Sequence, residues 1–347
     1  MKGKMRVLFK KNPGPGAEMG VADIPKPASK EVLIKIKASS ICGTDFHIYN
    51  WDSWSQHHIK TPRIFGHEFS GEVVEVGSGV TSLNVGDYVS SETHIVCEKC
   101  FQCKTGNGHV CTNTKILGID IDGIFAEYVV LPEVNIIKND LSIPPEVASI
   151  QEPFGNAVHS TFVDEIVGNR VVVFGCGPIG LFCCSLAKSA GASFVIGVDI
   201  KNYRLKLAKK MKADIVLNGK KDDVIGEIMK LTEDRGGVDV FLEMSGSPDA
   251  IQQGFKVLRP GGWASLLGIP SAPFEFDISE HIVFKGATVY GIIGRRMYDT
   301  WYKTQSILKS KIVDVMSVIT HKFKLEEFEK GFQLMKEGKC GKVILIP

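Results

Sequence analysis

The stretch Val171-Val172-Val173-Phe174-Gly175-Cys176-Gly177-Pro178-Ile179-Gly180 determines the fold that we expect for this chain. Its four leading apolar residues predict a buried strand, and the next segment, Leu181–Ala190, predicts a helix that Gly191 ends. In such a unit the first glycine permits a tight turn, the second lets backbone approach a pyrophosphate, and the third lets helix pack on strand. Pro178 suits the first helical position, and the free N–H groups of that turn would bind phosphate.

A second predicted strand, Ser193–Asp199, ends in an acid nineteen residues after Gly180. An acid at this spacing accepts hydrogen bonds from the adenosine ribose and repels a 2′-phosphate, so it favours NAD over NADP. Arg204 is the competing feature, because a cation there would soften that preference. The alternative, a strand–turn–helix without a ligand, does not account for the glycines and the acid in this order. We therefore predict an NAD site that includes Gly175, Gly177, Pro178, Ile179, Gly180, Asp199 and Arg204.

The length and composition are those of a globular protein with more than one domain. A chain of 347 residues is long for a single hydrophobic core, so we expect two domains. A net charge of +2 gives no reason to expect nucleic acid or an acidic membrane surface as a partner. No apolar run approaches the roughly 18 residues of a membrane span, and residues 1–16 hold no secretory signal. We expect a cytoplasmic protein whose nine cysteines are thiols and metal ligands rather than disulfides.

The first part of the chain, from Met5 to about Leu131, predicts an antiparallel β-barrel. Short alternating or β-branched runs are separated by turns rich in glycine and proline, as is typical of such barrels. The clearest of these runs are Glu31–Lys37, Gly71–Val76, Asp87–Ser91 and Phe125–Leu131.

Four cysteines in a polar loop form the more specific of two groups of metal-type residues. They are Cys97, Cys100, Cys103 and Cys111, a C-x2-C-x2-C-x7-C array. Such spacing lets one loop surround a tetrahedral ion with four thiolates, which is typical of a closed, structural zinc site. An iron–sulfur cluster is the alternative, but the ferredoxin pattern places its fourth cysteine after three residues and before a proline. The array therefore predicts structural zinc.

The second group is dispersed, and its spacing alone does not define a site. It consists of Cys42, the pair His67-Glu68, and Glu152. Taken singly, Cys42 would more often be a small buried hydrophobe, and His67 more often a hydrogen-bonded polar residue. The spacing alone leaves open whether these residues form a metal site or have only these structural roles.

From Val171 onward, strand and helix patterns alternate six times. We expect strands at 171–174, 194–199, 214–217, 238–242, 263–268 and 288–292, which indicates a doubly wound parallel sheet. Ligands of such sheets bind at the carboxyl ends of the strands. Residues at the ends of the fifth and sixth strands would therefore lie along the nicotinamide, although they could equally be plain strand ends: Leu266, Leu267, Gly268, Gly291 and Ile292.

Together these motifs resemble the zinc-containing medium-chain alcohol dehydrogenase family over nearly the whole chain. The resemblance implies a GroES-like antiparallel barrel and a doubly wound Rossmann domain. It implies domains at 1–154 and 155–293, with residues 294–347 returning to the first domain, and relatives commonly form tetramers. It also implies NAD and two zinc ions, one catalytic at Cys42, His67 and Glu68 and one structural at the four cysteines. Glu152 matches the acidic position near the catalytic zinc, while Thr44 and His47 match the pair that passes the substrate proton outward.

Three strings are similar to those members of the family that oxidise L-threonine at C3: His47–Asp52, Glu152–His159 and Gly294–Tyr302. A zwitterionic substrate needs partners for both charges, and we expect His94 or Arg295 to supply positive charge and Glu152 negative charge. Two alternatives stay open. One is a zinc enzyme acting on a vicinal diol or polyol, such as 2,3-butanediol or sorbitol. The other is a zinc-binding homologue that has lost its chemistry.

Overall fold

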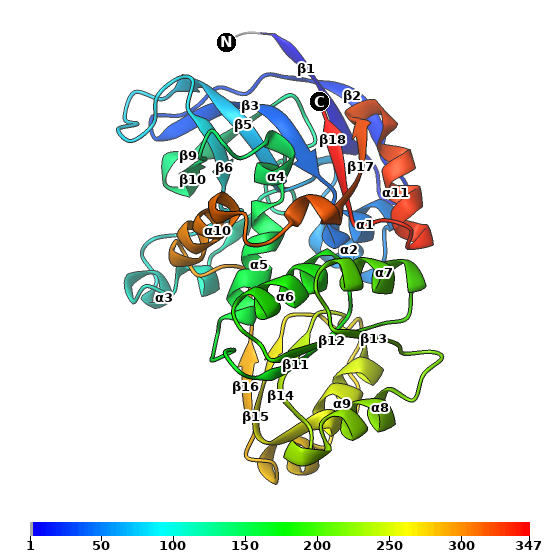
Figure 1. Cartoon of the computed structure of the whole chain (residues 1–347). Coiled ribbons are helices and arrows are strands. Elements are labelled where there is room, and N and C mark those ends of the chain that lie inside the picture. The colour runs from blue at the N-terminus through cyan, green and yellow to red at the C-terminus, as the bar shows by residue number, and fades with distance from the viewer. Residues whose placement is uncertain (1–2) are drawn as a thin grey trace.

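The computed structural model describes residues 3–347, so the first two residues of the predicted 1–154 domain lie outside it. The chain forms a β-rich lobe from its two terminal parts and an α/β lobe from its middle (Figure 1). The predicted division at 154/155 falls within helix α5 (Gln151–Thr161), which passes from one lobe to the other (Figure 1).

The α/β lobe is built on a parallel sheet with the strand order β13-β12-β11-β14-β15-β16. Its strands are β11 (Arg170–Phe174), β12 (Phe194–Asp199), β13 (Ile215–Asn218), β14 (Val238–Glu243), β15 (Leu258–Leu266) and β16 (Thr288–Gly291). The strands predicted from sequence are all present, although β15 begins five residues before the predicted 263. This order is that of a Rossmann sheet, in which the strand order reverses beside the first strand.

The four apolar residues 171–174 are consecutive because both faces of β11 are covered. Val171 and Val173 belong to a core shared with α6 (Pro178–Ser189) and α7 (Asn202–Lys210). Val172 and Phe174 belong to another core, shared with α8 (Val224–Leu231) and α9 (Pro248–Val257). A strand between two helical layers therefore loses the alternation that a half-exposed strand keeps.

The β-rich lobe contains the predicted antiparallel strands and others that the sequence analysis missed. Its largest sheet has the order β10-β6-β5-β3-β18-β17, with β9 also paired to β3, and a smaller sheet has the order β2-β1-β4. The strands are β1 (Lys4–Lys10), β2 (Glu18–Asp23), β3 (Glu31–Ser40), β4 (Arg63–Ile64), β5 (Glu68–Val76), β6 (Tyr88–Ser91), β9 (Tyr128–Pro132), β10 (Ile136–Lys138), β17 (Ile319–Lys324) and β18 (Lys342–Ile346). A short pair, β7 (His94–Ile95) and β8 (Lys115–Ile116), joins a loop that holds α3 (Phe101–Lys104). Helices α1 (Gly43–Asn50), α2 (Ser53–His58) and α4 (Pro145–Ser149) connect these strands.

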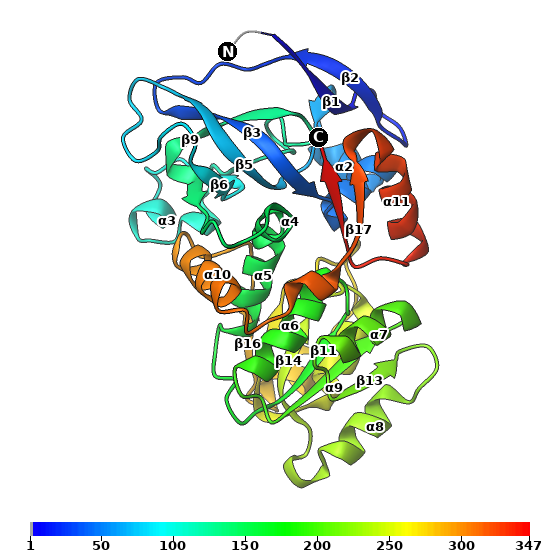
Figure 2. The same cartoon turned by 45° about the horizontal axis from the view of Figure 1, so that its top comes forward.

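The end of the chain returns to the first lobe, as predicted. Strand β18 pairs antiparallel with β3, with Ile344 opposite Ser40, and the two strands lie side by side in both views (Figures 1 and 2). Residues Leu325–Glu337 form a 3-10 turn followed by α11 (Phe328–Glu337). Helix α10 (Asp299–Ser310), which was not predicted, packs against α5 where the two lobes meet.

Candidate active site and metal centres

The cysteine loop brings its four sulfur atoms within 4.8 Å of one another. The Sγ of Cys100 lies 3.4 Å from that of Cys103 and 3.7 Å from that of Cys111, which is 3.5 Å from Cys97 Sγ. Four thiolates around a zinc ion at the usual bond length are about 3.8 Å apart. Backbone N–H groups of Cys103 and Thr112 lower the pKa of the Cys100 thiol to about 5, so it ionises readily. The donor set and its spacing fit a closed zinc site.

Cys42, His67 and Glu68 also converge, with one ligand atom of each within 4.8 Å of the others. The pairing of β3 with β5 explains this convergence, because it places Ser40 opposite Glu68. His67 therefore precedes one strand of the pair and Cys42 follows the other. His67 and Glu68 are buried and Cys42 is half-buried, so Cys42 would be the most accessible ligand of a metal ion held here. A thiolate, an imidazole and a carboxylate fit a zinc site with an open position.

Two buried groups that the sequence analysis missed hold these donors in place. The carboxylate of Asp45 lies 3.8 Å from His67 Nδ1 and accepts the backbone N–H of Cys42 at 2.8 Å. Burial raises the pKa of Asp45 to about 6. Lys342 on β18 donates to Glu68 Oε1 at 2.6 Å and to the Ile41 carbonyl at 3.1 Å. A lysine at the start of an apolar strand was the signal that could have pointed to it.

Thr44 and His47 lie on one face of α1, directly after Cys42. The Thr44 hydroxyl is 3.8 Å from Cys42 Sγ. The side chain of His47 is 57% exposed, so this face of α1 extends from the metal-type residues to the solvent-exposed surface. Of the two predicted relay residues, Thr44 therefore lies beside Cys42 and His47 lies at the surface.

Glu152 and Arg295 meet in a buried cluster between the lobes. Glu152 lies in the first turn of α5, and Arg295 Nη1 donates to it and, at 3.1 Å, to Asn156 Oδ1. The other two nitrogens of Arg295 donate to Glu92 and Thr93. Glu92 also accepts from Trp301 Nε1 at 2.7 Å.

Direct substrate contact by Arg295, as expected from sequence, does not agree with this cluster. The guanidinium is 1% exposed, and each of its three nitrogens already has a partner. The arrangement favours a positioning role, in which Arg295 holds the carboxylates of Glu92 and Glu152. Glu92 was missed because a single acid in a serine-rich segment gives no spacing signal.

His94, the other candidate for substrate contact, lies on β7 and is 8% exposed. Its Nδ1 has no hydrogen-bond partner within the described chain. Its ring lies against Gly294, where an added Cβ would be 2.6 Å from the imidazole Cε1. His94 therefore remains able to take a polar partner.

The glycine loop has the geometry that a pyrophosphate requires. Gly175 has φ +92°, Gly177 is the N-cap of α6, and Pro178 occupies its first turn. A Cβ at Gly180 would lie 1.9 Å from the carbonyl oxygen of Gly175, so only glycine permits this packing of helix on turn. The space around Gly177 is open, which leaves the N-terminus of α6 accessible beside half-buried Ile179.

Asp199 ends β12 beside this loop and shapes it. Its Oδ2 accepts the N–H of Cys176 at 2.9 Å, and its Oδ1 accepts the N–H of Lys201 at 2.8 Å. Arg204 Nη1 lies 3.7 Å from the same carboxylate. Asp199, which favours NAD, and Arg204, which would soften that preference, are therefore neighbours in the structure.

The predicted nicotinamide-side residues gather at the carboxyl ends of β15 and β16. Leu266 pairs with Gly291, and Ile292 donates its N–H to the Leu266 carbonyl at 2.9 Å. Leu267 and Gly268 donate to the carbonyl of Glu243, which ends β14, at 3.1 and 3.3 Å. These five backbone positions, which come from two separate parts of the sequence, thus lie together at the carboxyl edge of the parallel sheet.

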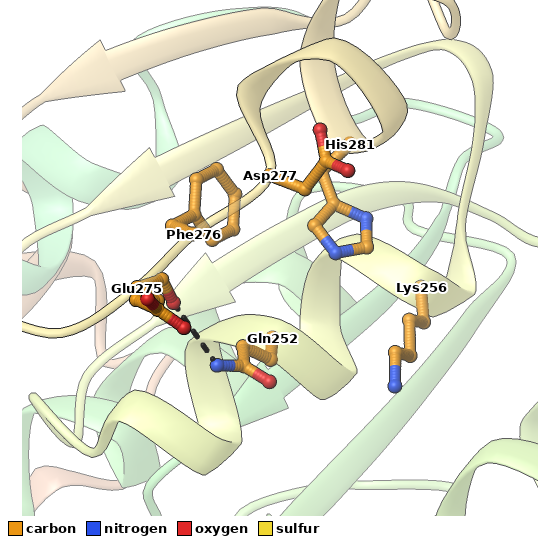
Figure 3. A pocket seen from close by; sticks show the side chains of 6 residues that line it. All are labelled: Gln252, Lys256, Glu275, Phe276, Asp277 and His281. Atoms are coloured by element: carbon orange, nitrogen blue, oxygen red, sulfur yellow. Dashed lines mark hydrogen bonds between the residues drawn. The ribbon is translucent and has the colours of Figure 1, made fainter.

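A surface pocket of about 510 Å³ lies elsewhere, between α9 and the segment that follows β15 (Figure 3). It is lined by Gln252, Lys256, Glu275, Phe276, Asp277 and His281. The Gln252 amide donates to the Glu275 carbonyl across it at 3.2 Å. None of the site residues predicted from the sequence lines this pocket, so it has no part in the site described above.

Comparisons with known proteins agree with this arrangement. A model of the alcohol dehydrogenase GroES-like domain matches residues 28–144, and one of the zinc-binding dehydrogenases matches residues 178–310. The chain is 51% identical over 347 residues to an L-threonine 3-dehydrogenase of Bacillus licheniformis, covering 100% of both proteins. The chain belongs to the zinc-binding alcohol dehydrogenase family.

Solved structures in this family share the whole fold. The 2R,3R-butanediol dehydrogenase of Bacillus subtilis is 30% identical, with a TM-score of 0.89 and 99% of each chain covered. An alcohol dehydrogenase of Escherichia coli CFT073 complexed with NADH is 28% identical, with a TM-score of 0.90 and 99% of each chain covered. As a member of this family the chain is an oxidoreductase acting on a small molecule, and zinc and a nicotinamide dinucleotide are the cofactors expected of it. Among residues 3–347, no helix combines the length and apolar character needed to cross a membrane.

Proposed function

We propose that this protein oxidises L-threonine at C3 to 2-amino-3-oxobutanoate, with NAD as hydride acceptor. The convergence of Cys42, His67 and Glu68 at the end of the β3–β5 pair, with the Thr44 hydroxyl beside them, carries the proposal. Identity of 51% to an L-threonine 3-dehydrogenase over both full lengths supports threonine as the substrate.

The reaction separates a hydride from a proton at one carbinol. The C3 hydrogen leaves with its electron pair for NAD, and the hydroxyl proton must reach solvent. Zinc held by Cys42, His67 and Glu68 would supply Lewis acidity toward the hydroxyl oxygen. The Thr44 hydroxyl both accepts and donates a hydrogen bond, so it takes the proton at Oγ1 and passes it on. His47, at the exposed end of α1, delivers the proton to water.

Glu152 and His94 are the proposed partners of the substrate's ammonium and of its carboxylate. Both are nearly buried, and both lie beside the Gly294-Arg295 turn. Arg295 keeps the carboxylate of Glu152 in position. An Arg295→Leu variant would remove the cationic partner of Glu92 and Glu152 and should lower kcat, whereas Arg295→Lys keeps the charge and should retain more activity.

The cofactor assignment is NAD rather than NADP, with two zinc ions in each chain. The Asp199 carboxylate at the end of β12 favours a free ribose over a 2′-phosphate. The closed four-cysteine site and the more open site at Cys42 each have enough donors for one ion.

We propose that the enzyme works in the cytoplasm as a homotetramer whose chains divide at 1–154, 155–293 and 294–347. Strand β16 forms one edge of the described parallel sheet. The exposed apolar side chains of Ile278, Val283 and Phe284 belong to the segment that precedes β16 in the chain. An unpaired strand edge with apolar neighbours favours pairing with a second copy.

The test compares NAD reduction with L-threonine, 2,3-butanediol and sorbitol at equal concentrations, following NADH absorbance. We expect the highest kcat/KM with threonine. A higher value with butanediol would instead assign a diol dehydrogenase, the second candidate, which the 30% identity to a butanediol dehydrogenase favours. No NADH from any alcohol, with zinc bound, would indicate a zinc-binding homologue without catalysis.

A further inference from the structure

Asp52 is an acid outside the site predicted from sequence, and it contacts the exposed end of the proposed proton path. The Asp52 Oδ2 atom lies 2.5 Å from His47 Nδ1. The two side chains are 36% and 57% exposed, respectively, so solvent screens their attraction. Their pairing therefore contributes little to folding.

The carboxylate of Asp52 is fixed independently of His47. It is the N-cap of α2, and its Oδ1 accepts the backbone N–H of Ser55 at 3.0 Å and the Ser55 hydroxyl at 3.1 Å. Ser55 is fully buried. Burial works to raise the pKa of Asp52, but the hydrogen bonds from Ser55 and His47 outweigh it and keep this pKa below its usual value. Asp52 is thus ionised, and its second oxygen, Oδ2, faces Nδ1 of His47.

The turn between His47 and Asp52 is anchored on both sides. Trp51 adopts the left-handed conformation that ends α1, and its N–H donates to the His47 carbonyl at 2.9 Å. The ring of Tyr49 stacks on Phe332 of α11, with centroids 4.3 Å apart. The buried ammonium of Lys10 donates to the Tyr49 carbonyl at 3.3 Å and lies 5.1 Å from the Trp51 ring centroid. Three elements therefore hold the spacing between the histidine and the acid.

An ionised carboxylate only accepts hydrogen bonds, so it fixes the tautomer of the imidazole that faces it. With Nδ1–H donated to Asp52, Nε2 is left with its lone pair. Nε2 is then the atom that accepts the proton arriving from Thr44, and the paired carboxylate steadies the cation that forms. A histidine in the opposite tautomer would present an N–H to the path and could not accept.

We propose that Asp52 is a positioning residue for the reaction, which holds His47 in the orientation and tautomer that accept the substrate proton. This inference rests on the proposed function, because it requires His47 to relay a proton during alcohol oxidation. No bond to Asp52 forms or breaks, and the net transfer remains one hydride to NAD and one proton to water.

The test is Asp52→Asn in the full-length, zinc-loaded enzyme. Asparagine caps helices as well as aspartate does, so α2 should keep its start and the Tm should stay within about 2 °C. Its amide N–H facing Nδ1 would favour the opposite tautomer, and kcat with threonine should fall at least about 10-fold. NAD affinity and zinc content should not change. Added imidazole buffer should restore activity in proportion to its concentration, because a free base replaces the missing acceptor.

Asp223→Asn is the matched control, since Asp223 caps α8 in the distant lobe, and it should leave kcat unchanged. The double variant His47→Asn/Asp52→Asn separates the two proposals. If Asp52 acts through His47, the double variant has the same kcat as His47→Asn alone. Full activity of Asp52→Asn beside an inactive His47→Asn would overturn only the role of Asp52, as would an additional loss in the double variant. Full activity of His47→Asn would overturn the proposed relay itself.

Discussion

Cys42 lies where β3 turns into α1, and it is the least enclosed of the three donors in its group. A serine there keeps the size of the side chain but offers no thiolate at neutral pH. We predict that Cys42→Ser loses one zinc ion for each chain and at least about 100-fold in kcat, while NAD affinity stays unchanged. Metal analysis, NADH absorbance and a fluorescence titration with NAD measure the three quantities. Cys340→Ala, which changes a cysteine outside both groups, should keep both ions; intact kinetics in Cys42→Ser would refute the catalytic assignment.

Glu68, one of the three donors of the same site, forms a buried ion pair with Lys342. Removing one partner of such a pair leaves an uncompensated charge, which typically costs about 3–5 kcal/mol. We predict that Lys342→Met lowers the free energy of unfolding by about 3 kcal/mol, measured by urea titration after chelation of zinc. Lys342→Met/Glu68→Gln, which removes both charges, should recover most of the loss. Equal stability of the single and double variants would show that charge is not the cause.

The loop that holds α3 has little apolar packing of its own, since the helix buries no residue and Phe101 is 75% exposed. An ion bound by its four cysteines would add stability that the apolar packing of this loop does not supply. Cys100→Ser is therefore expected to lose one zinc ion and to lower the Tm by several degrees, with kcat retained in the folded fraction. Metal analysis and thermal unfolding test this. A Tm equal to wild type would argue against a structural ion here.

At the amino-terminal ends of the parallel strands, one carboxylate accepts hydrogen bonds from residues on two neighbouring strands. Asp239 on β14 accepts the N–H of Arg170 at 2.8 Å and the Arg259 Nε at 2.6 Å. Burial works to raise the pKa of Asp239, but these partners outweigh it and keep the pKa below its usual value. The stabilisation is thus present above the unfolded pKa of about 4 and is lost as the pH falls through the lower folded pKa.

Asp239→Asn should therefore reduce the free energy of unfolding at neutral pH by about 1–3 kcal/mol. The difference from wild type should stay constant above about pH 5 and shrink as the pH falls below about 4. Urea unfolding between about pH 3 and pH 7 measures it. A difference that does not change with pH would mean that packing, not charge, is responsible.

At the scale of the whole molecule, the proposed homotetramer can be tested at the sheet edge that β16 forms. Phe284 is 78% exposed and Val283 is 63% exposed, and both precede β16 by a few residues in the chain. A charge introduced there would be buried in any interface that covers the patch, at a cost of several kcal/mol. We predict that Phe284→Glu forms a smaller assembly than wild type by light scattering. Tyr302→Glu, which changes an exposed aromatic on α10, is the control and should leave the mass unchanged. An unchanged mass for Phe284→Glu would place the interface elsewhere.

Much of the fold was predictable because it depends on local patterns. Consecutive β-branched residues, the glycines of the turn and the spacing to Asp199 predicted the parallel sheet, strand by strand. The missed elements lack such patterns. Helix α5 contains Pro153 and Gly155, and β2 contains Gly20, so their periodicity is interrupted. These segments take their structure from the strands and helices that they pack against.

The Rossmann sheet, the cysteine loop and the list of metal-type residues could be predicted before folding was known, since each depends on residue type at short spacing. Which distant residues meet depends on how the strands and lobes pack. The β3–β5 register brings Cys42 to His67, the returning strand β18 brings Lys342 to Glu68, and the meeting of the lobes buries Arg295 among carboxylates. Coordination and ion pairing act over a few ångströms in space, whatever the separation along the chain. Strand register and lobe packing set those distances, and no local pattern encodes them.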